Sequence, residues 1–583
     1  MKTLEAPWWV TRPEIYAREI EDLRARGIKL VNQGRWRSEL LLKLDVPIEG
    51  MEDLRVDAVY PPLYPYFRPQ VQPDDTSFTL NRHQHPFGKH FCLLANSEKW
   101  HSSYTLGWLL QVQLPEVLKF RTRDAAELKN LEEPIGESVA NYYKYEEDAC
   151  VFTDSAWQLD PAIPEGKLRL AYCDRAPFRG VVKLVYDSGE QVLAQAPSAL
   201  ASLFADEVWA RWVRVEEAIR EENAAVILDM LDKRFPELAR HQAKKKSDRP
   251  LVTGIVFRDE LQQGVYGDNW VFIRRGAKPK FIRNSRAGPS DFGARVPELA
   301  PVRAKTVTTL GLGSLGMPSA MEFARAGLHH IKAADYDFVD AGSTVRWPIG
   351  LSVAGLKKVA VLKDFVARNY PYTIVTPFQS HIGHVFNELE AADQVVIPQL
   401  LDADLVYDAT ADWEVNHAFS TLAAERGIPY LCISTTPGGW GGLVFRQRVG
   451  PERACWSCLQ HYLTDESIET PRAKPGGTLQ PVGCASATFT GASFEGGMIA
   501  LMGVRLAIST LCAGRDDAYP DVDWDCAVAQ LRDENGQVLA PSWRPYVIAR
   551  HSNCHGPTHK THAMDAAAPA HANAVPGDRE VPA

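Results

Sequence analysis

The sequence predicts an α/β protein whose C-terminal half folds as a doubly wound, mostly parallel sheet. Three observations lead to this fold class. Strand-like segments alternate with helical ones, a glycine-rich loop separates the first strand from the first helix, and acidic residues follow later strands. The chain has 583 residues, more than one hydrophobic core accommodates, so several domains are expected.

The first 125 residues or so predict a separate α+β domain. A proline-rich run, residues 60–69, excludes helix and central strand and is expected to form an extended, rigid loop. Around it the pattern predicts, in order, a helix at about 13–25, strands at 39–46 and 54–59, Cys92, and a helix from 104 to about 120.

Residues 130–290 carry no chemical motif and are expected to form a mixed connecting domain. Short strands are predicted at 168–172, 180–186 and 254–257, and a helical stretch at about 201–238. Gly288-Pro289-Ser290 predicts a boundary.

From about residue 303 the pattern becomes a βαβ series, which predicts parallel strands covered by helices. Strands are expected at 305–310, 331–334, 374–377, 405–407 and 430–434, and helices at 318–326, 359–369 and 415–426. The last 25 residues or so, rich in Ala, Pro and His, are expected to be disordered. The domain bounds predicted are 1–128, 129–290, 291–556 and 557–583.

Composition narrows the class of partner. The formal charge of −9 gives no general attraction to a phosphate backbone, so no nucleic-acid partner is expected. No run of eighteen apolar residues predicts a membrane span, and the N-terminus lacks the apolar core of a signal peptide. Ten cysteines are too sparse for a disulfide scaffold. A cytoplasmic protein with reduced thiols is therefore expected.

A nucleotide site is predicted at the glycine loop formed by Gly311, Gly313 and Gly316. A Gly-x-Gly-x-x-Gly between a strand and a helix turns backbone amides and a helix N-terminus toward phosphate. Asp335 and Asp337 follow the second strand, where a ribose would lie. These features alone suit a dehydrogenase equally well.

The residues that follow favour a triphosphate. Arg346 and Lys358 would offset the charge that develops on pyrophosphate, and a later strand ends in Asp408 and Asp412, where a carboxylate could hold Mg²⁺. A dinucleotide redox site needs none of these groups. The sequence therefore predicts ATP and Mg²⁺ at this site.

In this order the motifs resemble the adenylyltransferase family typified by ThiF and MoeB, over about residues 303–512. The chain departs from the family pattern at Thr344, where the family has Asn, and at Trp347, where it has Gln. The resemblance implies a Rossmann-like adenylation domain that forms an acyl adenylate at a protein's C-terminal carboxylate and releases pyrophosphate. It also implies a homodimer.

A zinc site is suggested by Cys455 and Cys458, which have the spacing of metal ligands. The family often completes such a site with a second Cys-x-x-Cys near the C-terminus. The best counterpart here is His551 with Cys554, and His555 and His559 are alternatives. A reduced thiol pair without metal is the other interpretation.

Cys484 follows a polar stretch, 459–483, and precedes a helix rich in small residues. In the family this is the crossover loop, where a cysteine can receive the carrier as a thioester or a persulfide-linked species. A mobile thiol near a helix N-terminus favours the thiolate, although a buried small residue is the alternative. Three other cysteines are expected to be inert core thiols: Cys432, Cys512 and Cys526.

Cys92 follows His85-Pro86-Phe87 and precedes Trp100, in an order of elements that resembles the ubiquitin-conjugating fold over roughly residues 10–125. Phe87 stands where that family has the Asn credited with supporting the oxyanion, and the interval to the cysteine is about three residues shorter. Three residues are candidates to replace the missing donor: His83, His90 and Asn96. A buried, inert Cys92 is the alternative.

The leading hypothesis is a fused activating and conjugating enzyme, which most resembles the CD-NTase-associated proteins of CBASS antiphage operons. Its substrate would be a protein with a free C-terminal tail, either the operon's nucleotide cyclase or a ubiquitin-like protein. The acyl group would pass from Cys484 to Cys92 and then to a target lysine. Two alternatives remain: a sulfur-carrier adenylyltransferase with a non-catalytic N-terminal domain, and a catalytically dead binding scaffold with a Rossmann core.

Overall fold

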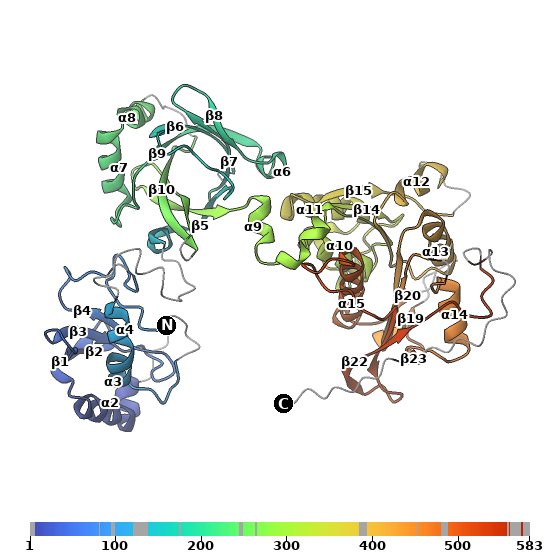
Figure 1. The fold of residues 1–583 in the computed structure, drawn as a ribbon, viewed down its shortest axis with the longest axis horizontal. Coiled ribbons are helices and arrows are strands. Elements are labelled where there is room, and N and C mark those ends of the chain that lie inside the picture. The colour runs from blue at the N-terminus through green and yellow to red at the C-terminus, as the bar shows by residue number, and fades with distance from the viewer. Residues whose placement is uncertain are drawn as a thin grey trace. The chain divides into compact units, whose positions relative to one another are not determined.

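The computed structural model describes residues 6–80, 82–94, 100–119, 138–173, 177–243, 249–262, 265–383, 393–450, 452–479, 488–556, 559 and 573–574. The chain divides into two compact units (Figure 1). The first comprises Met1–Pro197 and Phe204–Arg286, and the second Ser198–Leu203 and Ala287–Ala583.

The N-terminal part of the first unit is a helix followed by a four-stranded antiparallel sheet in the order β1-β2-β3-β4. Side chains of β2 alternate between buried and half-buried, because one face of the sheet covers the core. The elements are α1 (Trp8–Thr11), α2 (Pro13–Ala25), β1 (Lys29–Trp36), β2 (Glu39–Val46), β3 (Leu54–Val59), β4 (Gln70–Pro73), α3 (Leu106–Trp108), the π-helical turn η2 (Leu109–Gln113) and α4 (Leu114–Leu118). The helices and two strands predicted here are confirmed.

The proline-rich run is a loop, but it is turned rather than extended as predicted. The carbonyl of Pro61 accepts a hydrogen bond from the amide of Tyr64, which closes a turn. Buried Glu19 on α2 explains why the run folds back. Its carboxylate accepts hydrogen bonds from the hydroxyls of Tyr60 (3.1 Å) and Tyr64 (2.5 Å) and from the amide of Leu106 (2.9 Å).

The rest of the first unit is an eight-stranded sheet in the order β5-β12-β11-β10-β9-β6-β7-β8, and β5 also pairs with β7. Its elements are η4 (Val139–Tyr142), β5 (Tyr145–Thr153), β6 (Glu165–Cys173), β7 (Arg179–Asp187), β8 (Val192–Gln195), β9 (Asp206–Arg214), α7 (Ala224–Arg234), α8 (Pro236–Ala243), β10 (Val252–Gln262), β11 (Val265–Arg274) and β12 (Lys280–Arg286). The helix predicted at 201–238 is wrong over β9, because Val208, Ala210 and Trp212 alternate into the core of a strand paired on both sides.

The second unit is built on a nine-stranded sheet in the order β15-β14-β13-β16-β17-β18-β21-β22-β23. The first five strands are parallel, which confirms the doubly wound sheet, and the antiparallel continuation was not predicted. Its strands are β13 (Thr306–Leu310), β14 (His330–Ala334), β15 (Ile374–Phe378), β16 (Leu405–Asp408), β17 (Tyr430–Thr435), β18 (Gly441–Gln447), β21 (Cys526–Arg532), β22 (Val538–Val547) and β23 (Asn573–Ala574).

Two hydrophobic clusters pack against this sheet. One includes residues of α10, α11 and α15, and the other residues of α12, α13 and α14. The helices are α9 (Pro289–Gly293), α10 (Gly316–Arg325), α11 (Lys358–Asn369), α12 (Asp393–Leu400), α13 (Trp413–Arg426), α14 (Trp456–Thr464) and α15 (Ser493–Cys512). The helices predicted after the first, second and fourth parallel strands along the chain are confirmed.

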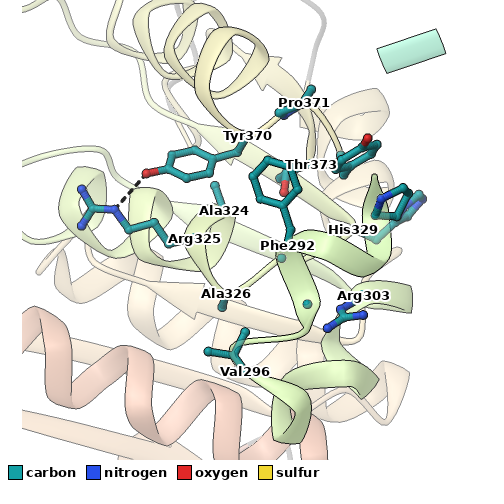
Figure 2. A pocket seen from close by; sticks show the side chains of 14 residues that line it. Phe292, Val296, Arg303, Ala324, Arg325, Ala326, His329, Tyr370, Pro371 and Thr373 are labelled. Atoms are coloured by element: carbon teal, nitrogen blue, oxygen red, sulfur yellow. Dashed lines mark hydrogen bonds between the residues drawn. The ribbon is translucent and has the colours of Figure 1, made fainter. Parts of the chain in front are cut away.

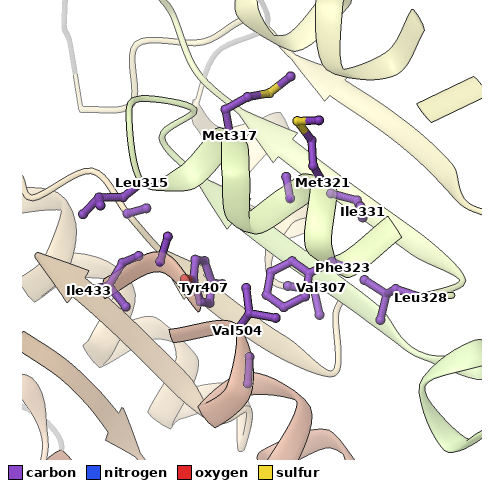
Figure 3. Packing of buried hydrophobic residues seen from close by; sticks show 14 of the residues in the cluster. Val307, Leu315, Met317, Met321, Phe323, Leu328, Ile331, Tyr407, Ile433 and Val504 are labelled. Atoms are coloured by element: carbon purple, nitrogen blue, oxygen red, sulfur yellow. The ribbon is translucent and has the colours of Figure 1, made fainter. Parts of the chain in front are cut away.

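Helix α15 is long and apolar enough to cross a membrane by composition alone, with a mean hydropathy of 1.3. In this fold it packs in the core, where Val504 lies close to Tyr407 and Phe323 (Figure 3). A side chain at Gly503 would reach within 2.5 Å of the Tyr407 hydroxyl, so α15 lies directly on the sheet. Its apolar character is accounted for by that burial.

Candidate functional site

The glycine loop leaves β13 at the point where the strand order reverses, because β14 lies on one side of β13 and β16 on the other. Gly311 has a positive φ of 76°, and a side chain there would contact Thr410. A Cβ on Gly316 would lie 1.8 Å from the Gly311 carbonyl. At Gly313 it would meet open space, so this residue leaves room for a ligand to approach the backbone.

Asp335 and Asp337 have different roles. Asp335 Oδ2 accepts a hydrogen bond from the amide of Leu312 at 2.6 Å, and Oδ1 accepts one from the amide of Asp337 at 2.7 Å. Asp335 therefore braces the glycine loop. Asp337 is exposed and lies 2.7 Å from Lys358 Nζ at the start of α11, which brings these two predicted site residues together.

The last two carboxylates predicted for the site, Asp408 and Asp412, lie at the end of β16 and in the turn that follows it. Asp408 is fully buried and accepts hydrogen bonds from Thr410 and from the Tyr430 hydroxyl, and burial raises its pKa. This geometry gives Asp408 a structural role, in place of the nucleotide contact expected from the sequence. Asp412 is exposed, and its Oδ1 caps α13 by accepting from the amides of Glu414 and Val415. Ala411 between them has a φ of 54°, a conformation that costs free energy and recurs at functional sites.

Arg346 lies just after the turn at residues 342–345 and contacts the segment at Thr488 and Phe489. Its guanidinium donates to the Phe489 carbonyl and to Thr488 Oγ1, and its carbon Cζ stands 4.8 Å from the centre of the Phe489 ring. Burial lowers the pKa of Arg346, but a guanidinium stays charged. Trp347, where the family has Gln, donates from Nε1 to the Leu312 carbonyl at 2.8 Å and so supports the glycine loop.

These groups share one electrostatic environment at the carboxyl ends of the parallel strands. Burial raises the pKa of Tyr336. The negative charges of Asp337, Asp335 and Asp412 raise this pKa further, and the positive charge of Lys358 lowers it. A site with backbone amides, cations and an exposed carboxylate suits a nucleoside triphosphate with its divalent cation. Asp412 is the residue whose exposed carboxylate fits Mg²⁺.

A separate pocket of about 270 Å³ lies at the opposite, amino-terminal edge of the sheet (Figure 2). It is lined by the end of α10, by His329 just before β14 and by Thr373 just before β15, with Phe292 and Tyr370 around it. Arg325 Nε donates to the Tyr370 hydroxyl beside it. The pocket is thus distinct from the glycine-loop site.

Cys455, Cys458 and Cys554 form one buried cluster, and the fourth member is His559. The prediction that His551 completes the set is wrong, because the His551 ring bonds Asp465 Oδ2 through Nε2 at 3.0 Å and accepts the Asn553 amide through Nδ1. His551 still touches the cluster through its backbone amide, 3.3 Å from Cys458 Sγ. His559, named in the sequence only as an alternative, takes its place.

The distances in the cluster fit a tetrahedral zinc ion. Sulfur ligands at about 2.3 Å from zinc are separated by roughly 3.8 Å, and a sulfur and an imidazole nitrogen by roughly 3.5 Å. Cys455 Sγ lies 3.7 Å from both Cys458 Sγ and Cys554 Sγ, and Cys458 Sγ lies 3.4 Å from His559 Nε2. The cluster is therefore a possible Cys/His metal site that would join α14 to the segment after β22.

The remaining cysteines of this unit divide into two groups. Cys484 lies outside the described residues. Cys432, Cys512 and Cys526 are buried, and burial raises the pKa of each thiol. Their prediction as core thiols is confirmed.

Cys92 lies in a segment whose neighbours are anchored in the core. Phe91, Leu93 and Leu94 are each at most 5% exposed, and Cys92 is half-exposed. The amide of Phe91 donates to the Val71 carbonyl, and that of Cys92 to the His83 carbonyl, both at 2.7 Å. This arrangement fixes the backbone and leaves Cys92 partly exposed, which contradicts a fully buried Cys92.

Phe87 packs away from Cys92, against the neighbouring mixed domain of the same unit. Its ring centre lies 5.7 Å from that of Tyr143, and the His85 ring centre lies 4.6 Å from that of Tyr142. The aromatic residue at the family's Asn position thus serves as an anchor between domains. No signal in the sequence identified this role.

Comparisons with known proteins agree with the glycine-loop site. Residues 290–518 match the ThiF family. The uncharacterized protein y4oA of Sinorhizobium fredii (strain NBRC 101917 / NGR234) is 29% identical over 587 residues, which cover 94% of this chain and 97% of that protein. The similarity to y4oA therefore includes the N-terminal unit.

Two further relatives match only part of this chain. The adenylyltransferase and sulfurtransferase UBA4 of Yarrowia lipolytica is 26% identical over 160 residues, 27% of this chain and 37% of its own length. The ubiquitin-like modifier-activating enzyme 5 of Branchiostoma floridae is 24% identical over 186 residues, which cover 30% of this chain and 44% of that protein. Residues 290–518 therefore form a ThiF family domain, homologous to the enzymes that activate ubiquitin-like proteins.

Proposed function

We propose that this protein activates the C-terminal carboxylate of another protein as an acyl adenylate and then conjugates it through thioesters. The observation that carries the proposal is the group of charged residues around the glycine loop: Lys358, Arg346 and Asp412. A ThiF domain with these residues has the parts that adenylation requires.

In the first step a carboxylate oxygen of the substrate protein attacks the α-phosphorus of ATP. The bond between the α-phosphorus and the bridging oxygen breaks, and pyrophosphate leaves with its electron pair. Amides of the glycine loop hold the phosphates, and Lys358 and Arg346 offset the growing negative charge. Mg²⁺, when held by Asp412, would neutralise further charge on the pyrophosphate.

Later steps move the acyl group between thiols. The Cys484 thiolate attacks the carbonyl carbon and AMP leaves; the Cys92 thiolate then displaces Cys484. Finally a lysine amine of the target displaces the Cys92 thiolate and loses a proton to solvent. The half-exposed position of Cys92 among buried neighbours supports its role as acceptor.

The proposed substrate is a protein with a free C-terminal tail, either the nucleotide cyclase of the same operon or a ubiquitin-like protein. The name of the similar ubiquitin-like modifier-activating enzyme 5 supports the second choice. We further propose a cytoplasmic homodimer with a role in antiphage defence, and zinc as the occupant of the cluster of Cys455, Cys458, Cys554 and His559.

Intact-mass spectrometry tests the proposal. The full-length protein is incubated with Mg-ATP and each candidate substrate, and adducts are measured with and without reductant. A reducible adduct is expected in the wild type and in the matched control Cys173→Ala, and no final transfer is expected from Cys92→Ala or Cys484→Ala. A final product formed equally by Cys92→Ala would contradict the relay, and the absence of ATP–pyrophosphate exchange would contradict adenylation itself.

A second candidate is a sulfur-carrier adenylyltransferase, which the name of UBA4 favours. In that case Cys484 would form a persulfide-linked species and Cys92 would have no role. Full activity of Cys92→Ala together with dependence on a persulfide donor would identify this function.

A further inference from the structure

A Cys92 thiolate needs a group that stabilises negative charge, and Phe87 and His90 are both engaged elsewhere. Phe87 has no donor and packs on Tyr143. His90 is held against the His85 ring, with ring centres 4.6 Å apart, and burial lowers its pKa, which favours the neutral form. Asn96, another candidate, lies outside the described residues.

Arg68 reaches this segment from the proline-rich loop, two positions before β4. Its Nη1 donates to the carbonyl of Leu94 at 2.6 Å, while the amide of Phe91 bonds Val71 on β4. The guanidinium therefore bonds the chain two residues after Cys92. Arg68 also lines a cavity of about 470 Å³ together with Phe67 and Trp100, so a ligand could approach it from solvent.

The charge of Arg68 has no carboxylate counter-ion in the part of the chain that the structure describes. Its side chain is half-buried, where an uncompensated charge is costly. Burial lowers the pKa of Arg68, and the electrostatic interaction with Cys92 acts against this shift. A negative charge on the Cys92 sulfur would therefore be favourable for the guanidinium.

We infer that Arg68 is the positioning residue of Cys92, which holds its thiolate electrostatically and anchors its segment through Leu94. The inference deepens the proposed function, since it rests on Cys92 being the residue that forms the thioester. When the thiol ionises, its proton goes to solvent and the guanidinium remains protonated.

The test is the pH dependence of Cys92 alkylation by iodoacetamide, measured by peptide mass spectrometry on the full-length protein without ATP. Arg68→Gln keeps an N–H donor for the Leu94 carbonyl but removes the charge, and Arg68→Lys restores the charge. Arg55→Met, which removes an exposed guanidinium paired with Asp45 in the same domain, is the matched control.

In Arg68→Gln we expect the pH of half-maximal alkylation to rise by about one unit and the rate at pH 7 to fall roughly three- to tenfold. Arg68→Lys should recover most of the rate, and Arg55→Met should match the wild type. An unchanged midpoint in Arg68→Gln would overturn the inference. If that variant does not fold, an unchanged midpoint in Arg68→Met, or a wild-type midpoint that does not move with salt concentration, would overturn it.

The two proposals fail in distinguishable ways. A shifted alkylation midpoint without any ATP-dependent adduct would support Arg68 as the partner of the thiolate and contradict the conjugating function. An ATP-dependent adduct on Cys92 with no shift in Arg68→Gln would support conjugation and contradict the role of Arg68.

Discussion

Lys358 and Asp337 illustrate how single residues prepare the nucleotide site. They form an ion pair of 2.7 Å, with the Lys358 side chain 14% exposed and that of Asp337 53% exposed. The pair holds the ammonium group near the glycine loop, where phosphate charge would lie. A cation held in a fixed position reorganises less when charge develops on a bound phosphate.

Lys358→Met is expected to reduce ATP–pyrophosphate exchange at least about tenfold, because a cation that stabilises the leaving pyrophosphate is lost. The control is Lys305→Met, which removes a lysine that is also paired with an aspartate, Asp404, but lies at the other end of β13 and is 35% exposed. Its exchange rate should stay close to that of the wild type. Equal losses in both variants would show that Lys358 has no specific role.

Glu19 predicts a pH effect. Burial raises the pKa of Glu19 above its ordinary value, although three donors bond the carboxylate. The folded state therefore takes up a proton at higher pH than the unfolded chain. This contribution to stability is fully present below the unfolded pKa and is lost as pH rises through the folded one.

Relative to Glu19→Gln, which cannot titrate, the wild type is expected to gain stability as pH falls from 7 to about 5. Hydrogen exchange of α2 amides measures this difference within the full-length protein. A difference between the two proteins that is constant over this range would contradict the raised pKa.

For single residues, the sequence predicts which side chains can bind a metal better than it predicts which neighbours those side chains contact. The spacing of Cys455 and Cys458 and the position of Cys554 were sufficient to predict three members of the Cys/His cluster. His551 was chosen over His559 because its spacing to Cys554 resembles a Cys-x-x-Cys pair. Asp465 and Asn553, which hold the His551 ring, are contacts that no spacing reveals.

Among the elements, α13 and α14 link the nucleotide site and the cysteine cluster. Asp412 caps α13, and the Trp413 ring centre lies 4.4 Å from that of Trp456, the first residue of α14, which directly follows Cys455 of the cluster. The metal would hold α14 against the end of the sheet. The cluster is thus placed to stabilise the wall of the site.

Metal content distinguishes the two histidines. His559→Ala is expected to weaken zinc binding about 100-fold or more, since a ligand is lost, whereas His551→Ala should remain within about tenfold of the wild type. Metal analysis after a graded challenge with chelator measures both. Loss of zinc from His551→Ala alone would restore the assignment made from the sequence.

Predictability of the elements followed the strength of their periodicity. The parallel strands β13, β14 and β16 were predicted because they are short, apolar and separated by helical segments. Strand β9 was not, because its alternation of charged and aromatic residues also fits one face of a helix, and pairing with β6 and β10 decides between them. Such pairing is not visible in a local pattern.

At the scale of the whole molecule, Phe87 connects the domain that carries Cys92 with the eight-stranded domain. The ring packs on Tyr143, which itself stacks on Phe281 with ring centres 4.6 Å apart. Phe87 thus has a structural use in this chain. It keeps two domains of one unit together.

Phe87→Ala is expected to destabilise this contact by about 2 kcal/mol, since a half-buried aromatic ring is lost. Hydrogen exchange of the amides at 139–145 should rise accordingly. Phe67→Ala, which removes a ring that is 58% exposed, is the matched control and should leave these amides unchanged. Equal protection in wild type and Phe87→Ala would contradict the anchor.

The cluster of Cys455, Cys458, Cys554 and His559 has a topological consequence. Cys455 and Cys554 are 99 positions apart, so a bound metal would close a covalent-like ring around the chain between them. If the metal acts like a disulfide, closing a loop of this length lowers the entropy of the unfolded chain and stabilises the folded state by about 4.7 kcal/mol. The ring contains Cys484 and all of α15. After a single cleavage by a protease within this loop, the metal would still join the two fragments, and a chelator would release them. The chain could therefore be cleaved near Cys484 without separation of its two parts.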